Sequence, residues 1–131
     1  DLSGLKSIKG DYVHRVLIGA RKTLGHGVGK LNEVGAELAR LDGDKILEAI
    51  RSSPDLYSTH AFMLIAGGAG GTGSGSLPIV AQMLKERYFG KPVYALVALP
   101  FEHEIATELR SVYNTAICLK SGAVSNTNAI H

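Results

Sequence analysis

The stretch of sequence that decides the fold is residues 66–76, AGGAGGTGSGS. It follows an uninterrupted apolar run at residues 61–66 (AFMLIA), which is typical of a strand in a parallel sheet covered on both faces. It precedes apolar residues at helical spacing, namely Leu77, Val80, Ala81, Leu84 and Tyr88. Glycines between a strand and a helix let backbone N–H groups surround phosphate oxygens, and the positive end of the helix dipole faces the same place. The stretch therefore predicts a strand, a phosphate-binding loop at residues 67–75 and a helix that begins near Ser76.

The same alternation is found on the N-terminal side of this loop. The β-branched and apolar residues 12–18 (YVHRVLI) predict a strand, and a second glycine loop follows at residues 23–29 (TLGHGVG). Apolar residues at helical spacing then predict an amphipathic helix over residues 31–41, with a break at Gly43. The second part of this helical region ends at residues 52–54 (SSP), because proline disfavours helix in the residue before it.

On the C-terminal side, residues 93–99 (VYALVAL) predict another buried strand, and Pro100 turns the chain. One last helix is predicted from the spacing of Ile105, Leu109, Val112 and Ile117. Strands that alternate with helices indicate an α/β fold, a Rossmann-like parallel sheet with right-handed crossovers and helices on both faces. Ligands bind at the carboxyl ends of the strands in such sheets, and both glycine loops are expected at that edge.

The composition limits the class of protein. The chain has 131 residues, enough for one domain, and a net charge of +2 that does not favour nucleic-acid binding. No apolar run is long enough for membrane insertion, and no secretory signal peptide is present, so we expect a cytoplasmic protein. The single cysteine, Cys118, cannot form an internal disulfide. Residues 122–131 are polar without clear periodicity, and we assign them no structure.

Two other phosphate-binding motifs are alternatives to consider. A P-loop ends in Gly-Lys-Ser/Thr, and the stretch 66–76 contains no lysine. The dinucleotide pattern G-x-G-x-x-G is present at Gly68, Gly70 and Gly73. Its usual acidic residue, about 20 positions further on, is only partly matched, because the first carboxylate after the next strand is Glu102. An NAD(P)-binding Rossmann module of an oxidoreductase therefore remains an alternative.

Three segments resemble those of one GTPase superfamily. Residues 69–75 (AGGTGSG) resemble the tubulin/FtsZ signature, and residues 25–35 (GHGVGKLNEVG) resemble its GxGxGxxxEVG segment. Residues 99–104 (LPFEHE) are similar to its proline-phenylalanine turn, and Tyr113-Asn114 is similar to a pair found in tubulins. The combination is most similar to the archaeal CetZ-like, tubulin-like proteins. The resemblance covers residues 1–121, as the central portion of the nucleotide-binding domain, and leaves 122–131 as an unassigned tail.

The resemblance implies a site that binds GTP or GDP, with Mg²⁺ brought by the triphosphate and no metal ligand set in this chain. It places the following residues at the phosphates: Gly68, Ala69, Gly70, Gly71, Thr72, Gly73, Ser74, Gly25, His26, Gly27, Val28 and Gly29. It suggests candidates for the ribose and base side: Glu104, Glu108, Arg110 and Asn114. We expect Gly71 and Gly73 to lie so close to the phosphates that alanine there weakens binding with little change in the fold. The catalytic residues are unknown.

The resemblance also implies a cytoskeletal GTPase that self-associates into filaments, in which the next subunit completes the hydrolytic site. The family's first strand with its glycine loop, its base-contacting helix and its acidic loop have no counterpart in this sequence. Either the chain is a fragment, or segments have been left out of it. We therefore expect these 131 residues alone to be inactive as a GTPase. A non-catalytic assembly module of the same family is a further alternative.

Overall fold

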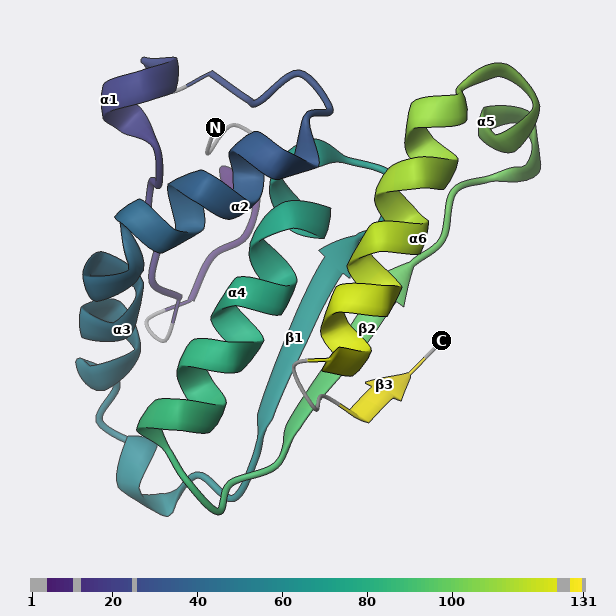
Figure 1. The fold of residues 1–131 in the computed structure, drawn as a ribbon. Coiled ribbons are helices and arrows are strands. Elements are labelled where there is room, and N and C mark those ends of the chain that lie inside the picture. Colours follow the sequence, from purple (N-terminus) through teal and green to yellow (C-terminus); the bar gives the residue numbers. More distant parts are fainter. Residues whose placement is uncertain (1–4, 11–12, 25, 125–127, 131) are drawn as a thin grey trace.

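The computed structural model describes residues 5–10, 13–24, 26–124 and 128–130 (Figure 1). Its elements, in chain order, are α1 (Ala20–Thr23), α2 (Asn32–Leu41), α3 (Gly43–Arg51), the short 3-10 helix η2 (Leu56–Ser58), β1 (Phe62–Gly67), α4 (Gly71–Arg87), β2 (Val93–Ala98), α5 (Glu102–Thr107), α6 (Leu109–Val124) and β3 (Asn128–Ile130). None of the helices in these ranges is long and apolar enough to cross a bilayer.

The three strands form a parallel sheet in the order β1-β2-β3. The register runs from Phe62 opposite Val93 to Gly67 opposite Ala98. One further hydrogen bond, from the Gly68 N–H to the Ala98 carbonyl at 2.9 Å, extends the pairing beyond β1. The α/β prediction is confirmed, and the glycine stretch begins at the carboxyl edge of the sheet.

The helices of the described residues cover one face of this sheet (Figure 1). Leu77 of α4 and Cys118 of α6 pack with Ala95 and Val97 of β2 to form the main core. On the opposite face, three apolar side chains are exposed, namely Met63 (53%), Ile65 (73%) and Leu96 (40%). In the described part of the chain, the helices that contact the sheet therefore lie on one face. The reason is topological, because two right-handed crossovers that advance in the same direction place their helices on the same face.

The predicted strand at residues 12–18 is wrong for residues 13–18, and Tyr12 lies outside the described residues. Here and at Gly19, backbone groups bond to side chains. The Lys45 ammonium donates to the Leu17 carbonyl, and the Gly19 N–H donates to Asp42 Oδ2 at 2.6 Å. A β-branched composition favours extended backbone, but a strand also needs a neighbouring strand with which to pair.

Four further boundaries differ from the predictions. Helix α4 begins at Gly71 rather than near Ser76, so the second half of the predicted loop is helical. The single C-terminal helix is instead α5 and α6, separated at Glu108, which leaves helical geometry at φ −131° and ψ 88°. Residues 122–124 continue α6, and the following segment supplies the third strand, β3. Thr23 ends α1 rather than beginning the loop.

Candidate functional site

The start of helix α4 forms one side of the candidate site. Gly70 is its N-cap, in extended geometry at φ −76° and ψ 168°, and no side chain caps the helix. The first four N–H groups of a helix have no acceptor within it, and they carry the positive end of the helix dipole. Gly70 and Thr72 are exposed, whereas Ser74 is buried and its hydroxyl donates to the Gly70 carbonyl. This helix start offers backbone donors to an anion.

Several glycines at this helix start are required for packing within the chain. A Cβ on Gly71 would lie 2.5 Å from Val28 Cγ2 and 2.7 Å from the Leu31 nitrogen. A Cβ on Gly75 would lie 2.0 Å from the Asn32 carbonyl oxygen, and one on Gly35 of α2 would lie 2.3 Å from the Gly71 carbonyl oxygen. These separations are too short for any side chain, so Gly71 lets the second loop lie against the start of α4, and Gly35 and Gly75 allow α2 to pack closely against α4.

Other glycines of the same stretch face different surroundings. A Cβ on Gly67 or Gly70 would meet no described atom within 4 Å. A Cβ on Gly68 would lie 3.0 Å from Val97 Cγ1 and 3.1 Å from Thr115 Oγ1, so this glycine is needed where the loop crosses β2 and α6. A Cβ on Gly73 would lie 3.2 Å from the Gly67 carbonyl oxygen, which is a tight contact. Packing within the described chain therefore gives no reason for glycine at positions 67 and 70.

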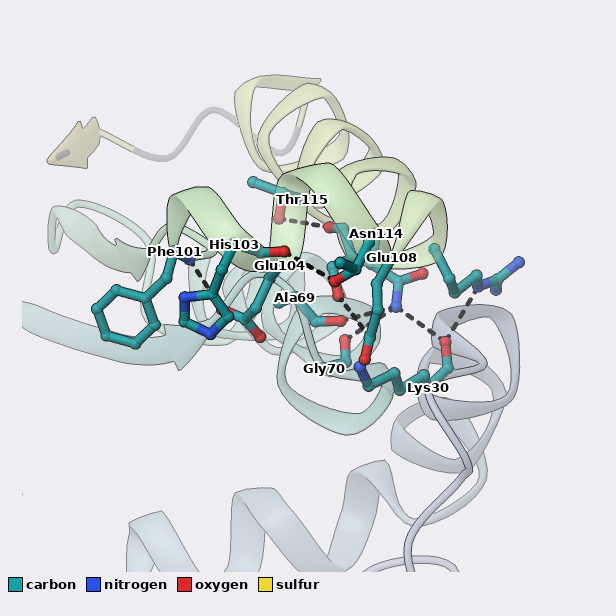
Figure 2. Close-up of polar contacts among 12 residues, drawn as sticks. Lys30, Ala69, Gly70, Phe101, His103, Glu104, Glu108, Asn114 and Thr115 are labelled. Carbon is teal, nitrogen blue, oxygen red and sulfur yellow. Dashed lines mark hydrogen bonds and ion pairs between the residues drawn. The ribbon is translucent and has the colours of Figure 1, made fainter.

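The second glycine loop lies against the start of α4 through Val28. Gly29 (φ 59°) and Lys30 (φ 62°) are both left-handed, and the Leu31 N–H donates to the Val28 carbonyl at 3.1 Å, as in a type I′ turn. His26 and Gly27 are exposed, and Gly25 lies outside the described residues. The structure thus places this loop beside the first one, with the Lys30 carbonyl directed toward α6 (Figure 2).

Asn114 of α6 connects the two loops (Figure 2). Its side chain is fully buried, at 0% exposure, and Nδ2 donates to three carbonyls: Lys30 at 2.8 Å, Ala69 at 3.0 Å and Gly70 at 3.4 Å. The amide oxygen Oδ1 is buried and has no hydrogen-bond partner among the described residues. Asn114, a candidate for the ribose and base side, therefore lies beneath the loops with its amide group bound to their backbone.

Charged side chains lie around the hydrogen bonds between Asn114 and the two loops. The Arg110 guanidinium donates to the Lys30 carbonyl at 3.1 Å and to Asn32 Oδ1 at 3.1 Å, and it pairs with Glu33. The Lys30 ammonium pairs with the Glu108 carboxylate (Figure 2). Hydrogen bonds from its own backbone N–H and from Arg110 hold the pKa of Glu33 below its usual value. Two candidates, Glu108 and Arg110, are thus held at the second loop by ion pairs.

The fourth candidate, Glu104, lies at the start of α5, where Oε2 accepts from the Phe101 N–H at 2.8 Å (Figure 2). Its carboxylate thus closes the turn after β2, and no contact joins it to either glycine loop among the described residues.

Lys30 and Glu33 were not predicted as site residues. Their positions directly after the glycine loop and within the EVG segment are the only sequence signal that points to them.

Metal binding by protein side chains has no support in the described part of the chain. No group of three histidine, cysteine, aspartate or glutamate side chains there could hold a metal ion.

Comparison with known proteins identifies one family. The sequence model described as tubulin/FtsZ family, GTPase domain, matches residues 1–129. The chain is 48% identical over 104 residues to the tubulin-like protein CetZ1 of Haloferax volcanii, covering 79% of this chain and 25% of that protein. It is 35% identical over 119 residues to the tubulin-like protein CetZ of Pyrococcus furiosus, covering 91% and 31%.

Solved structures agree with this match. The GDP-bound monomer of CetZ1 from Haloferax volcanii superposes with a TM-score of 0.77 at 39% identity, covering 85% of this chain and 32% of that chain. The GTPγS-bound protofilament of CetZ2 from the same organism gives 0.79 at 33% identity, covering 86% and 32%. The empty FtsZ dimer of M. jannaschii gives 0.68 at 31% identity, covering 83% and 29%. The chain thus spans between a quarter and a third of the length of these relatives.

Proposed function

Because this chain belongs to the tubulin/FtsZ family, we propose that its two glycine loops and the start of α4 bind the phosphate chain of GTP or GDP. The observation that carries the proposal is the meeting of these three segments at the carboxyl edge of the sheet, joined by Asn114. The GDP-bound and GTPγS-bound CetZ structures support the choice of ligand. The proposed phosphate contacts are Gly68, Ala69, Gly70, Gly71, Thr72, Gly73, Ser74, His26, Gly27, Val28 and Gly29, with Gly25 of the same loop.

The chemistry of binding follows from backbone donors. The first N–H groups of α4 and the helix dipole attract a phosphate group, and glycine at positions 67 and 70 leaves space for its oxygens. The Ser74 hydroxyl donates to the Gly70 carbonyl in this structure, and it is the group that this residue could turn toward a phosphate. We propose Glu104, Glu108 and Arg110 for the ribose and base side. Magnesium, when bound with the triphosphate, neutralises phosphate charge, and the described protein side chains form no cluster to hold it.

We further propose that the full-length protein assembles into filaments in the cytoplasm and hydrolyses GTP at the contact between subunits. The CetZ2 protofilament and the family match support this. The carboxylates nearest the second loop, Glu33 and Glu108, are ion-paired within the chain, and the pKa of Glu33 is lowered. A base that activates water needs a pKa near the working pH, so the lowered pKa of Glu33 makes this carboxylate unsuited to that role. The catalytic group is therefore expected from a neighbouring subunit.

A competition titration on the full-length protein tests the ligand. A fluorescent GDP analogue is displaced by unlabelled GTP, GDP or NAD, and we expect displacement by the two guanine nucleotides at concentrations at which NAD has no effect. Tight binding of NAD with no effect of GTP would instead support the dinucleotide-binding alternative suggested by Gly68, Gly70 and Gly73.

A further inference from the structure

The orientation of the Asn114 carboxamide is fixed by what surrounds it. Its nitrogen faces the carbonyl oxygens of Lys30, Ala69 and Gly70. A carboxamide turned by 180° would place its oxygen against three acceptors, so only the nitrogen can occupy this position. Oδ1 is then left in a buried place without a partner among the described residues. An apolar side chain of similar size would avoid that unsatisfied oxygen, which suggests that the donor itself is needed.

The donor determines the direction of two neighbouring peptide groups. In a trans peptide the carbonyl and the following N–H point to opposite sides. The Ala69 carbonyl points at Asn114, so the Gly70 N–H points away from it, and the Gly70 carbonyl likewise directs the Gly71 N–H away. Gly70 is exposed, and the space where its Cβ would be is free of described atoms. The Gly70 N–H at the start of α4 is therefore turned toward the open side, and the N–H of the buried Gly71 points away from Asn114.

The same donor also fixes the second loop. The Lys30 carbonyl accepts from both Asn114 and Arg110, and it belongs to the turn of Gly29 and Lys30. A single buried side chain thus sets the position of one loop relative to the other. Its own location, beneath the backbone of both loops and fully buried, keeps it away from any ligand bound on the open side.

We propose that Asn114 is a positioning residue that holds the Ala69 and Gly70 carbonyls so that the Gly70 N–H faces outward to meet a phosphate group, and that it does so without touching the nucleotide. The inference rests on the proposed GTP site, because the anion in question is the phosphate chain of that nucleotide. It assigns Asn114 a role different from contact with the ribose or base.

The test compares Asn114→Leu with Cys118→Ala in the full-length protein. Cys118 lies one turn further along α6, is buried in the core with Leu77 and Val97, and contacts neither loop, so it controls for lost packing. Both variants are titrated with GDP under conditions where circular dichroism shows them folded. We expect at least a tenfold weaker affinity for Asn114→Leu and a change below twofold for Cys118→Ala. If Asn114→Leu does not fold, Asn114→Ser, whose hydroxyl is one bond too short to reach the same carbonyls, is judged by the same tenfold criterion.

A second measurement on nucleotide-free protein reports the peptide groups directly. With [¹⁵N]glycine labelling, the amide signals of Gly70 and Gly71 should shift in Asn114→Leu, or in its replacement Asn114→Ser, and stay in place in Cys118→Ala. Unchanged signals, or GDP affinity within twofold of the parent in the folded variant, would overturn the inference while leaving the proposed function intact. If the parent does not bind GDP, the proposed function fails, and the inference about phosphate binding fails with it. In that case, shifted glycine signals would still show that Asn114 orients these peptide groups.

Discussion

Replacing Gly71 with alanine should lower the stability of the fold, because the new methyl group has no space. Its carbon would lie 2.5 Å from Val28 Cγ2, 2.7 Å from the Leu31 nitrogen and 2.8 Å from the Lys30 carbonyl carbon. Ordinary contacts between such atoms are about 3.5–4.0 Å, so the overlap is about 1 Å. Two of the three atoms are backbone, so the second loop must move as a whole. Overpacking of this kind costs about 1–3 kcal/mol.

Gly70→Ala is the matched comparison one residue earlier. Its methyl group would meet no described atom within 4 Å, and φ is −76°, which any residue adopts. The unfolding free energy should therefore stay within about 0.5 kcal/mol of the parent. If the phosphate chain lies beside the N-cap, the same methyl group occupies its space, and nucleotide affinity should fall. Our sequence-based expectation for Gly71, weaker binding with little change in the fold, is corrected by these contacts.

The assay is urea unfolding of the nucleotide-free full-length protein, followed by GDP titration of each folded variant. Gly71→Ala should shift the urea midpoint to lower concentration, and Gly70→Ala should leave the midpoint in place but weaken GDP binding. A Gly71→Ala midpoint equal to that of the parent would show that the loop relaxes freely, and would refute the packing argument. GDP affinity of Gly70→Ala equal to that of the parent would exclude Gly70 from the phosphate path.

The remaining predictions concern the second loop, acid stability and turnover. Gly29 has a φ of 59°, which a residue with a Cβ rarely adopts, so Gly29→Ala should lower the unfolding free energy measured in urea by about 1 kcal/mol. In Gly27→Ala the new Cβ would meet no described atom within 4 Å and φ is not positive, so the urea midpoint should not change. The pKa of Glu33 is lowered in the folded state. Its ionised carboxylate therefore stabilises the fold fully above the unfolded pKa of about 4.3, and this stabilisation is lost as the pH falls through the folded pKa. Unfolding measured from pH 7 to pH 3 should therefore depend less on pH in Glu33→Gln, and identical profiles would contradict this. In a phosphate-release assay, the rate per subunit of the full-length protein should rise with protein concentration, and these 131 residues alone should show no turnover. A concentration-independent rate would remove assembly from the mechanism, and turnover by the isolated chain would place the catalytic group within it.

Local sequence patterns determined the order and type of most elements. The apolar runs at residues 61–66 and 93–99 became β1 and β2, and the helical region is broken at Asp42, one residue before the predicted Gly43, which begins α3. These signals are local because burial on a sheet or a helix face imposes a period on neighbouring residues. The same signals failed at residues 13–18, where strand formation depends on a pairing partner, and at Glu108, where exposed Ile105 and Leu109 imitated a buried stripe.

The roles of individual residues at the candidate site were decided only by tertiary structure. The glycine signature marked the place, but it did not separate Gly71, which makes room for the second loop, and Gly75, which allows α2 to approach α4, from Gly67 and Gly70, which leave open space. Asn114 donates to Lys30, 84 positions earlier, and to Ala69, 45 positions earlier. No period or motif encodes such a separation, because these contacts exist only after the crossovers bring α6 beside both loops. The sequence by itself therefore specified a parallel sheet with glycine loops at its carboxyl edge, and the packing of α2, α4 and α6 determined which backbone groups of those loops face outward.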